Sequence, residues 1–499
     1  MNTIFVSNEN KSDFIGCTIT FGHFSTIHPG HIRYLSNAQK KGCKLVIAII
    51  GDSSSNEYLR FKYSQNERAN ALRMLNLADG LYLLNKDHLS EVIKILKPTN
   101  LVLGNEFKYS KNPEIIKSID ILKENKGNIF FDAGVINYTS SYLLEEPERY
   151  VKDKRSIAFR EALKRLNIKK SDLLESVKKF KAGNILVLGD TIIDQYIDSE
   201  PLGISAEAPV IVVREINRKN FIGGAAIVAA HIKSLGSICK YISVVGEDLI
   251  NDFLTKSLSS YNIEFNLIKD LKRPTTLKKR YLVENQKIFR VSKLDSKEIE
   301  KELENKIIEN FERISEDINV IVISDFNYGV ITERILEEIT NLAKKKNITL
   351  IGDVQCSSQI GYVTKLKDFD LICANEKEVR IALNDNSSGL ETLCRNLINK
   401  TGIKNLIMKL GSEGIIFYQV NHDKYVTSQP FPALSSHPID TAGAGDSLLA
   451  TMASGISAGV PINISTALSC IVSAISVKRM GNIPISHSDL ILEIKNMNF

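Results

Sequence analysis

The chain has 499 residues, of which 43% are hydrophobic and 24% are charged. This length exceeds one ordinary hydrophobic core and predicts two or three domains, and the composition excludes disordered and fibrous classes of protein. The formal net charge is +6, but Lys and Arg are interleaved with Asp and Glu along the whole chain. We therefore expect a solvated surface of mixed charge and small anionic substrates, with no nucleic acid as partner.

The seven cysteines are scattered and never stand in CxxC spacing. This pattern argues against a disulfide framework and a zinc site, and it favours a reducing compartment. The first residues lack the basic and apolar regions of a signal peptide, and no apolar run approaches the length of a membrane span. A cytoplasmic protein without membrane contact is the expectation.

Short apolar runs alternate with helical patterns from the start of the chain, as in proteins with parallel sheets. A helix is predicted over 31–41, where Gly42 ends it. The buried strands predicted around it are 17–21, 45–50, 101–103 and 129–131. These elements predict one doubly wound α/β domain over residues 1–144.

The turn between the first strand and the first helix combines Gly22 and Gly30 with His28 and His31. The glycines let the backbone approach a ligand, and a helix start presents free N–H groups to an anion. Two imidazoles three residues apart can stabilise charge on an α-phosphate while pyrophosphate leaves. Two incidental surface histidines are the weaker interpretation, because both stand beside glycines at a strand-to-helix turn.

The segment GHFSTIHPGH, residues 22–31, resembles the HxGH nucleotidyltransferase superfamily, whose usual opening is GxFDxxHxGH. The resemblance covers residues 17 to about 144 and implies a Rossmann-like domain with His28 and His31 as catalytic residues. Ser25 stands where the family usually has Asp, which bears on sugar-phosphate placement and metal geometry. Arg60 competes with Lys62 for the role of a phosphate-binding residue. The nucleotide contacts implied are Phe21, Gly22, Phe24, Gly30, Lys62, Arg68, Thr139 and Ser140.

Residues 145–182 are rich in Lys, Glu and Arg, with Leu and Ile at helical spacing. They predict a helical connector whose charged face is solvated. Because it carries few large apolar residues, neither domain is expected to depend on it much. A cut between Glu145 and Gly183 is therefore expected to give two soluble, separately active pieces.

A second α/β region, 183–499, opens with the apolar run 185–188 and contains the motif DTAGAGD at 440–446. A loop of small residues at a helix start offers backbone N–H groups to a γ-phosphoryl group in transfer. Asp446 is placed to accept a proton from a sugar hydroxyl. A lone glycine-rich turn can be a mere helix cap, but GAGD after Asp-Thr is far more specific.

This motif resembles the signature of the ribokinase/PfkB carbohydrate kinases, and the resemblance runs from about Gly183 to the end. It implies Asp446 as the catalytic base and Glu378, in the run NEKE at 375–378, as a residue that organises Mg²⁺ through water. Ile227 stands where relatives usually carry an Asn that holds the sugar. The anion hole and ATP contacts implied are Ala442, Gly443, Ala444, Gly445, Asn375, Lys409, Gly411 and Gly414. The sugar contacts implied are Asp190, Asp194, Gly223, Gly224 and Arg280.

The runs GISAEAPV (203–210), GGAA (223–226) and RPTTLKKR (273–280) resemble the heptose-7-phosphate kinase branch of that family. Bacterial bifunctional enzymes of heptose activation combine such a kinase with an HxGH adenylyltransferase; here the two halves stand in reversed order. The resemblance implies phosphorylation of a sugar phosphate at C1 with ATP, removal of the C7 phosphate by a separate phosphatase, and then transfer of AMP from ATP to the sugar 1-phosphate. The product is of the ADP-heptose type, for a surface glycan such as lipopolysaccharide. It also implies Mg²⁺ in both sites and leaves a homodimer open.

Two alternatives stay open. The first half can equally be a cytidylyl- or other nucleotidyltransferase that uses CTP, paired with a kinase for a different sugar or polyol phosphate. It can also be a nucleotide-binding module without chemistry attached to an active sugar kinase, which Ser25 favours and His28 and His31 oppose.

Overall fold

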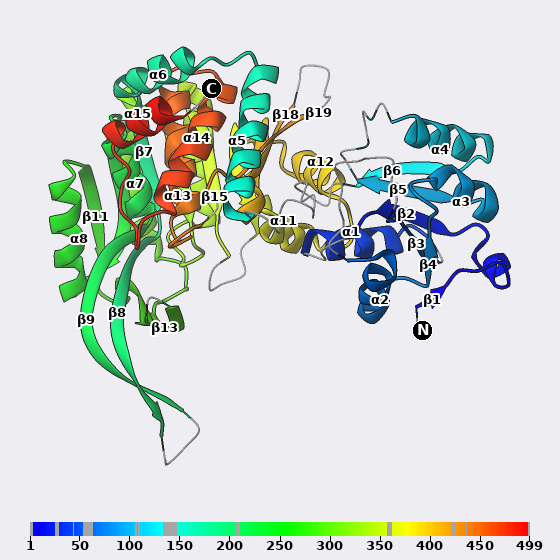
Figure 1. Cartoon of the computed structure of the whole chain (residues 1–499). Helices are drawn as coiled ribbons and strands as arrows, with labels where there is room; N and C mark the ends of the chain where they lie inside the picture. The colour runs from blue at the N-terminus through cyan, green and yellow to red at the C-terminus, as the bar shows by residue number, and fades with distance from the viewer. Residues whose placement is uncertain are drawn as a thin grey trace. The chain divides into compact units, whose positions relative to one another are not determined.

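The computed structural model describes residues 3–24, 29–42, 44–52, 63–104, 107, 110, 112–132, 147–205, 210–284, 286–356, 362–420, 426–435 and 437–497. The chain divides into two compact units, Met1–Val151 and Lys152–Phe499 (Figure 1). Each unit has a main sheet with helices on both of its faces, and the second unit has a further, smaller sheet.

The first unit has a six-stranded parallel sheet in the order β1-β4-β3-β2-β5-β6. The strands are β1 (Ile4–Phe5), β2 (Thr18–Gly22), β3 (Leu45–Ile49), β4 (Gly80–Leu83), β5 (Asn100–Gly104) and β6 (Asn128–Asp132). The order reverses between β2 and β5, and the carboxyl end of a strand at such a reversal is where open α/β sheets bind ligands.

Alternate residues along β3 enter two different apolar cores, because successive side chains of a strand point to opposite faces. One core contains helices α3 (Leu89–Leu96) and α4 (Pro113–Glu124), and the other contains α1 (Pro29–Gln39) and α2 (Gln65–Leu75). A short 3-10 helix, η1 (Lys11–Phe14), precedes β2. Helices therefore cover both faces of the sheet, as in a doubly wound fold.

The second unit is built on a nine-stranded sheet in the order β11-β10-β7-β14-β15-β16-β17-β18-β19. It is parallel except for the antiparallel edge formed by β18 and β19. The strands are β7 (Asn184–Gly189), β10 (Ile238–Gly246), β11 (Glu264–Asp270), β14 (Val320–Asp325), β15 (Thr349–Val354), β16 (Leu371–Asn375), β17 (Asn405–Lys409), β18 (Ile415–Val420) and β19 (Val426–Phe431). Here the order reverses between β7 and β14.

Two apolar cores cover the two faces of this sheet. The helices of one core are α5 (Pro147–Arg165), α6 (Lys170–Lys179), α7 (Ala225–Ser234), α8 (Leu249–Ser260), α13 (Ala444–Ser457), α14 (Ile462–Ser476) and α15 (His487–Asn496). Those of the other are α9 (Lys301–Ile314), α10 (Glu333–Lys346), α11 (Glu376–Leu383) and α12 (Leu390–Thr401). Within the described residues no helix is both long enough and apolar enough to cross a membrane.

A separate four-stranded sheet, in the order β13-β12-β8-β9, belongs to the second unit. Its strands are β8 (Thr191–Ile204), β9 (Ile211–Gly224), β12 (Thr276–Val283) and β13 (Gln286–Lys293). Figure 1 shows β8 and β9 as a long arm that extends away from the rest of this unit. Leu202, Ile211 and Ile216 are exposed on the arm.

The segment 145–182 corrects the predicted domain boundaries. It is helical from Pro147, as expected, but the second unit begins at Lys152. Its regularly spaced apolar side chains are buried in the core of that unit: Phe159, Ala162, Leu163, Leu173, Val177 and Phe180. The expectation of a connector on which neither core depends is therefore wrong, because the helical spacing of these few residues directs all of them into the core.

Candidate functional site

The motif 440–446 forms the start of helix α13. Gly443 is the N-cap residue with a φ of 79°, a backbone conformation that favours glycine. Asp446 lies in the first turn with its side chain 6% exposed, and Gln355 Nε2 donates a hydrogen bond of 2.9 Å to Asp446 Oδ1. Burial, and then repulsion from Asp353, raises the pKa of Asp446 to about 7. A carboxyl group that titrates near neutral pH at a helix start suits a general base.

Lys409, the last residue of β17, reaches beneath this helix start. Its Nζ lies 2.7 Å from Asp353 Oδ2, and a Cβ placed on Gly445 would lie 3.4 Å from the same Nζ. Burial works against the charged form, but Asp353 and Glu378 outweigh it and raise the pKa of Lys409. The ammonium group of Lys409 and the N-terminus of α13 therefore lie close together, and both favour a bound anion at this place.

Glu378 and Asn375 form a capping box at the start of α11. Asn375 Oδ1 accepts a hydrogen bond of 2.8 Å from Glu378 N, and Glu378 Oε2 accepts one of 2.8 Å from Asn375 N. Cys356 N donates to Glu378 Oε1 at 3.3 Å. The side chain of Glu378 is 3% exposed, and burial raises its pKa. The motif thus holds a buried carboxyl group within electrostatic reach of Lys409 and Asp353.

The donor set here is compatible with Mg²⁺ held through water. Within the described residues no group of three or more His, Cys, Asp and Glu side chains could hold a metal ion. Mg²⁺ in kinases is usually bound by one or two carboxylates together with waters and substrate phosphates. Asp353 Oδ1 is buried and has no hydrogen-bond partner in the described part of the chain, so this oxygen is available to a metal-bound water.

The residues predicted to contact the sugar form what we call the sugar side of the site. Asp194 of β8 is one of them, and it contacts Arg280 and Asn482 from two other parts of the second unit. Asp194 Oδ1 forms an ion pair with Arg280 of β12, and Asp194 Oδ2 accepts a hydrogen bond of 2.7 Å from Asn482 Nδ2. A Cβ placed on Gly443 would lie 2.6 Å from Asn482 Oδ1. Asn482 therefore connects Asp194 to the start of α13, so a predicted sugar contact and the predicted anion hole lie together.

The carboxylate of Asp190 accepts hydrogen bonds from the backbone of the protein itself. Its Oδ2 accepts hydrogen bonds from Phe326 N at 2.7 Å and Tyr328 N at 3.2 Å, and its Oδ1 accepts one from Val330 N at 3.3 Å. Burial, and then Asp325, raises the pKa of Asp190 to about 7. These bonds stabilise the loop after β14, and the sugar contact predicted for Asp190 stays a prediction.

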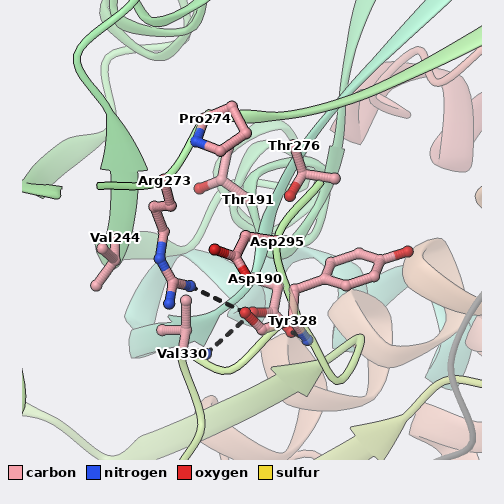
Figure 2. A pocket seen from close by; sticks show the side chains of 9 residues that line it. All are labelled: Asp190, Thr191, Val244, Arg273, Pro274, Thr276, Asp295, Tyr328 and Val330. Carbon is pink, nitrogen blue, oxygen red and sulfur yellow. Dashed lines mark hydrogen bonds between the residues drawn. The ribbon is translucent and has the colours of Figure 1, made fainter. Parts of the chain in front are cut away.

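Figure 2 shows a small pocket that Asp190 and Arg273 both line. Arg273 pairs with Asp270 and donates to the carbonyl oxygens of Tyr328 at 2.9 Å and Lys297 at 2.8 Å. The hydrogen bonds of Arg273 therefore hold the same loop from the other side. The other residues that line the pocket are Thr191, Val244, Pro274, Thr276, Asp295 and Val330.

Gly223 and Gly224 connect β9 to α7 where no side chain fits. A Cβ on Gly223 would lie 2.6 Å from Asp194 Oδ2, and one on Gly224 would lie 2.3 Å from the carbonyl oxygen of Asp190. Ile227, in the first turn of α7, is fully buried in the apolar core. An apolar side chain therefore suits the position at which relatives usually carry Asn.

The remaining kinase residues lie in the turns around these groups. Gly411, the first residue of the 3-10 turn η6 (Gly411–Glu413), and Gly414, directly after this turn, have φ angles of 63° and 106°. Ala444 N donates to Thr441 O at a long 3.4 Å. Ala442 N donates to Asp440 Oδ1 at 3.0 Å, so this amide is occupied by the protein. Of the four residues predicted to form the anion hole, Ala442 is therefore left out, and the amides of residues 443–445 remain as candidates.

Asp440, the first residue of the motif 440–446, makes several contacts for which the sequence analysis gave it no role. It accepts hydrogen bonds from Tyr196 Oη at 2.6 Å and Gly481 N at 3.2 Å, and it pairs with Lys287 Nζ at 2.7 Å. Tyr196 and Lys287 belong to the four-stranded sheet, so Asp440 links that sheet to the anion-hole loop. Asp353, Gln355 and Asn482 were missed too. Asp353 near the end of the buried strand β15 and Gln355 directly after it are polar residues at a strand end, a signal that could have found these two, whereas Asn482 carries no such signal.

In the first unit, four predicted residues gather at the carboxyl end of β2. Phe21 and Gly22 end the strand, and Phe24 follows with a φ of 51° and a buried ring. The ring centroid of His31, in α1, lies 5.2 Å from that of Phe24. Burial, and then Arg68, lowers the pKa of the neighbouring His23 to about 4. His31 therefore lies close to the carboxyl end of β2.

Arg68 of α2 holds the loops at this end of the sheet. Its Nη1 donates to the carbonyl oxygen of His23 at 2.5 Å, and its Nη2 donates to Ile50 O at 2.9 Å and to Asp52 Oδ1 at 2.8 Å. For Gly30, the backbone lies in the first turn of α1. The predicted residues His28, Lys62, Thr139 and Ser140, together with Ser25 and Arg60, lie outside the described residues.

The model of the pfkB family carbohydrate kinases matches residues 182–488. The chain therefore belongs to this family of carbohydrate kinases, which confirms the kinase predicted for the second half and makes the chain an enzyme. Two solved structures share the fold: phosphofructokinase-2 from Escherichia coli, with a TM-score of 0.52 and 16% identity, and ribokinase from Thermotoga maritima, with 0.50 and 21%. Each match covers 63% of this chain, and 99% and 100% of those chains respectively.

Among curated relatives, the bifunctional protein HldE of Campylobacter jejuni subsp. doylei is 32% identical over 317 residues, which cover 63% of this chain and 64% of the relative. The bifunctional protein HldE of Geobacter sulfurreducens is 29% identical over 316 residues, with 62% of each chain covered. The match thus spans less than two thirds of the length of these relatives.

Proposed function

We propose that this chain is a bifunctional enzyme of nucleotide-sugar synthesis. In this proposal the second unit phosphorylates a sugar phosphate of the heptose 7-phosphate type at C1 with ATP. A separate phosphatase removes the C7 phosphate, and the first unit then transfers AMP from ATP to the sugar 1-phosphate, which releases pyrophosphate and gives a product of the ADP-heptose type. The observation that carries the kinase half is the buried Asp446 at the start of α13, joined to the sugar side through Asn482 and Asp194.

For phosphoryl transfer, Asp446 accepts the proton of the attacking sugar hydroxyl. The amides of residues 443–445 and the ammonium group of Lys409 stabilise the negative charge on the transferred phosphoryl group. Mg²⁺, when bound, neutralises charge on the phosphate oxygens, and Glu378 and Asp353 would hold it through water. Lys409 and Asp353 bind each other, so each keeps the other in place.

A phosphorylated sugar is favoured by the cationic side chains around the sugar side. Arg280 pairs with Asp194, and Lys365 pairs with Asp325 at the end of β14. Lys278 is 3% exposed, and its Nζ lies 5.2 Å from the ring centroid of Tyr328. Arg and Lys form short, charge-assisted hydrogen bonds with phosphate oxygens.

The transferase half rests on the residues at the carboxyl end of β2. Gly22, Phe24 and His31 lie where an open α/β sheet binds nucleotides, and α1 begins next to them. The resemblance to the HxGH superfamily and the word "bifunctional" in the names of the relatives support a second activity. ATP is proposed as the nucleotide, with CTP as the competing outcome of the test.

The proposal is tested by incubating the purified full chain with sugar phosphates, sugar 1-phosphates and free sugars, each with ATP or CTP, and identifying products by mass. We expect a sugar bisphosphate from a heptose 7-phosphate and ATP, and an ADP-sugar from the matching sugar 1-phosphate. Phosphorylation of free sugars alone would reject the substrate class. A CDP-sugar would replace ATP by CTP in the first unit, and no nucleotide-sugar at all would leave that unit a binding module.

Replacing His31 or His28 by Ala is expected to reduce nucleotidyl transfer by about 10²–10³-fold, the usual cost of losing one donor to a developing negative charge. Kinase turnover should stay at the wild-type level, because Asp446 and Lys409 belong to the other unit. His88→Ala is the matched control: this side chain is 40% exposed at the start of α3. Equal loss of transfer in His88→Ala would show that the effect is not specific to the HxGH turn.

A further inference from the structure

Helix α5 places one buried cation against two carbonyl groups of the second unit. Arg155 is 6% exposed, although it stands in a segment rich in charged residues. Its Nη1 donates a hydrogen bond to the carbonyl oxygen of Ser435, and its Nη2 donates one of 3.1 Å to that of Ser412. Both partners are more than 250 positions away in the sequence. A buried guanidinium without such partners would be costly, so these contacts are strongly held.

The two carbonyl groups belong to segments that touch each other. Ser412 lies in the turn η6, which follows Lys409 at the end of β17. Ser435 lies between the end of β19 and the motif 440–446. A Cβ on Gly414 would lie 2.2 Å from the carbonyl oxygen of Phe431, so the turn and the segment after β19 are in close backbone contact. Arg155 binds both of them where they meet.

One helical turn further along, Phe159 strengthens the same contact. Residues four apart lie on one face of a helix. Phe159 is fully buried, and its ring centroid lies 6.1 Å from that of Phe431, the last residue of β19.

The planar guanidinium of an arginine can donate to two acceptors in a fixed geometry, which a lysine ammonium cannot reproduce. This face of α5 is therefore matched to the two segments.

We propose that Arg155 is a positioning residue of the nucleotide site of the kinase. It holds the turn η6 and the segment 432–435 against each other. In the sequence, the turn follows Lys409 and the segment precedes the motif 440–446. The inference rests on the proposed function, because it takes ATP as the ligand held by these segments at the carboxyl end of the sheet. Helix α5, which begins upstream of the family match at residue 182, thereby completes the kinase.

The test compares Arg155→Met with wild type in the full chain. We expect the KM for ATP to rise about tenfold, by analogy with the loss of hydrogen bonds from a charged donor. The kcat should change by less than about threefold, because Asp446 and Lys409 remain in place. The KM for the sugar phosphate should not change. Arg155→Lys keeps the positive charge but loses the planar guanidinium that donates to two carbonyl groups, and it should give an intermediate KM for ATP. This variant replaces Arg155→Met in the test if Arg155→Met does not fold.

The matched control is Arg160→Met, an exposed arginine five residues further along the same helix, which should match wild type in both constants. Phe159→Leu, which removes the ring contact with Phe431, should lower the melting temperature. A KM for ATP within twofold of wild type in the folded Arg155 variants would overturn the proposal. So would an equal rise in Arg160→Met.

Hydrogen exchange separates this inference from the proposed function. A non-hydrolysable ATP analogue should slow amide exchange in peptides that cover 411–414 and 432–435 of the wild type, whether or not a sugar is phosphorylated. In Arg155→Met the same peptides should exchange faster, and protection should need about ten times more nucleotide. Protection without turnover would reject the proposed substrate and keep the inference. Lack of protection in the wild type would overturn the inference.

Discussion

Asp446→Asn is expected to reduce sugar phosphorylation by about 10²–10⁴-fold, the usual contribution of a general base. Asn has the size and shape of Asp but cannot accept the proton of the attacking hydroxyl. The hydrogen bond from Gln355 Nε2 can be kept, because Asn still offers an oxygen acceptor. The KM for ATP should change little, since Lys409, Glu378 and the amides at the start of α13 are unaltered. Steady-state kinetics with the sugar phosphate and ATP measures both effects.

The pH profile of the wild type gives an independent check on the same group. Because the pKa of Asp446 is raised to about 7, the carboxylate that acts as a base is lost as the pH falls through 7. The value of kcat/KM should therefore decrease about tenfold per pH unit below this point and level off above it. Asp446→Asn should lack this limb.

The same raised pKa predicts the effect on stability. A carboxyl whose pKa is higher in the folded state than in the unfolded state destabilises the fold above the folded pKa. Asp446→Asn should therefore melt at or above the wild-type temperature at pH 8. Asp252→Asn is a suitable control, because Asp252 is exposed in the first turn of another helix, α8. Near-normal turnover in Asp446→Asn, or a comparable loss in Asp252→Asn, would contradict the role of Asp446.

Strands and helices with buried apolar runs could be predicted from the sequence to within a few residues. The predicted strands 45–50 and 129–131 correspond to β3 at 45–49 and β6 at 128–132. The predicted helix 31–41 is α1 at 29–39, which starts earlier because Pro29 suits the first turn of a helix. The strands β1 and β4, of two and four residues, were not predicted because such short runs carry too weak a pattern.

The site could be predicted where one motif contains its chemistry and not where distant segments meet. Asp446 and Glu378 stand in recognisable local patterns. Asn482 binds Asp194 across 288 positions, and Gln355 binds Asp446 across 91, so neither contact leaves a local signal. Asp190 shows the converse: the family resemblance implies it as a sugar contact, but its carboxylate accepts backbone hydrogen bonds that only the folded loop provides. The segment 145–182 was misjudged because its charged residues outnumber the apolar ones that decide its burial.

A chain that begins at Gly183 is expected to be insoluble and without kinase activity, whereas a chain that begins at Pro147 should fold and phosphorylate the sugar. The shorter chain loses α5 and α6 and with them a set of side chains buried in the core: Phe159, Ala162, Leu163, Leu173, Val177 and Phe180. Each large apolar side chain of this kind contributes about 1.5–3 kcal/mol when fully buried. Their joint loss approaches the whole stability of an ordinary domain, about 5–15 kcal/mol.

The loss would also expose the groups that these side chains cover. Without Arg155, the carbonyl groups of Ser412 and Ser435 lose their buried donor, and without Phe159 the ring of Phe431 loses a partner. The measurements are the soluble fraction on expression, the melting temperature and the KM for ATP of the chains 147–499 and 183–499. A soluble 183–499 chain with a wild-type KM for ATP would contradict the role of the two helices in the core and that of Arg155 at the nucleotide site. A soluble 183–499 chain with a weakened KM for ATP would contradict the first role alone.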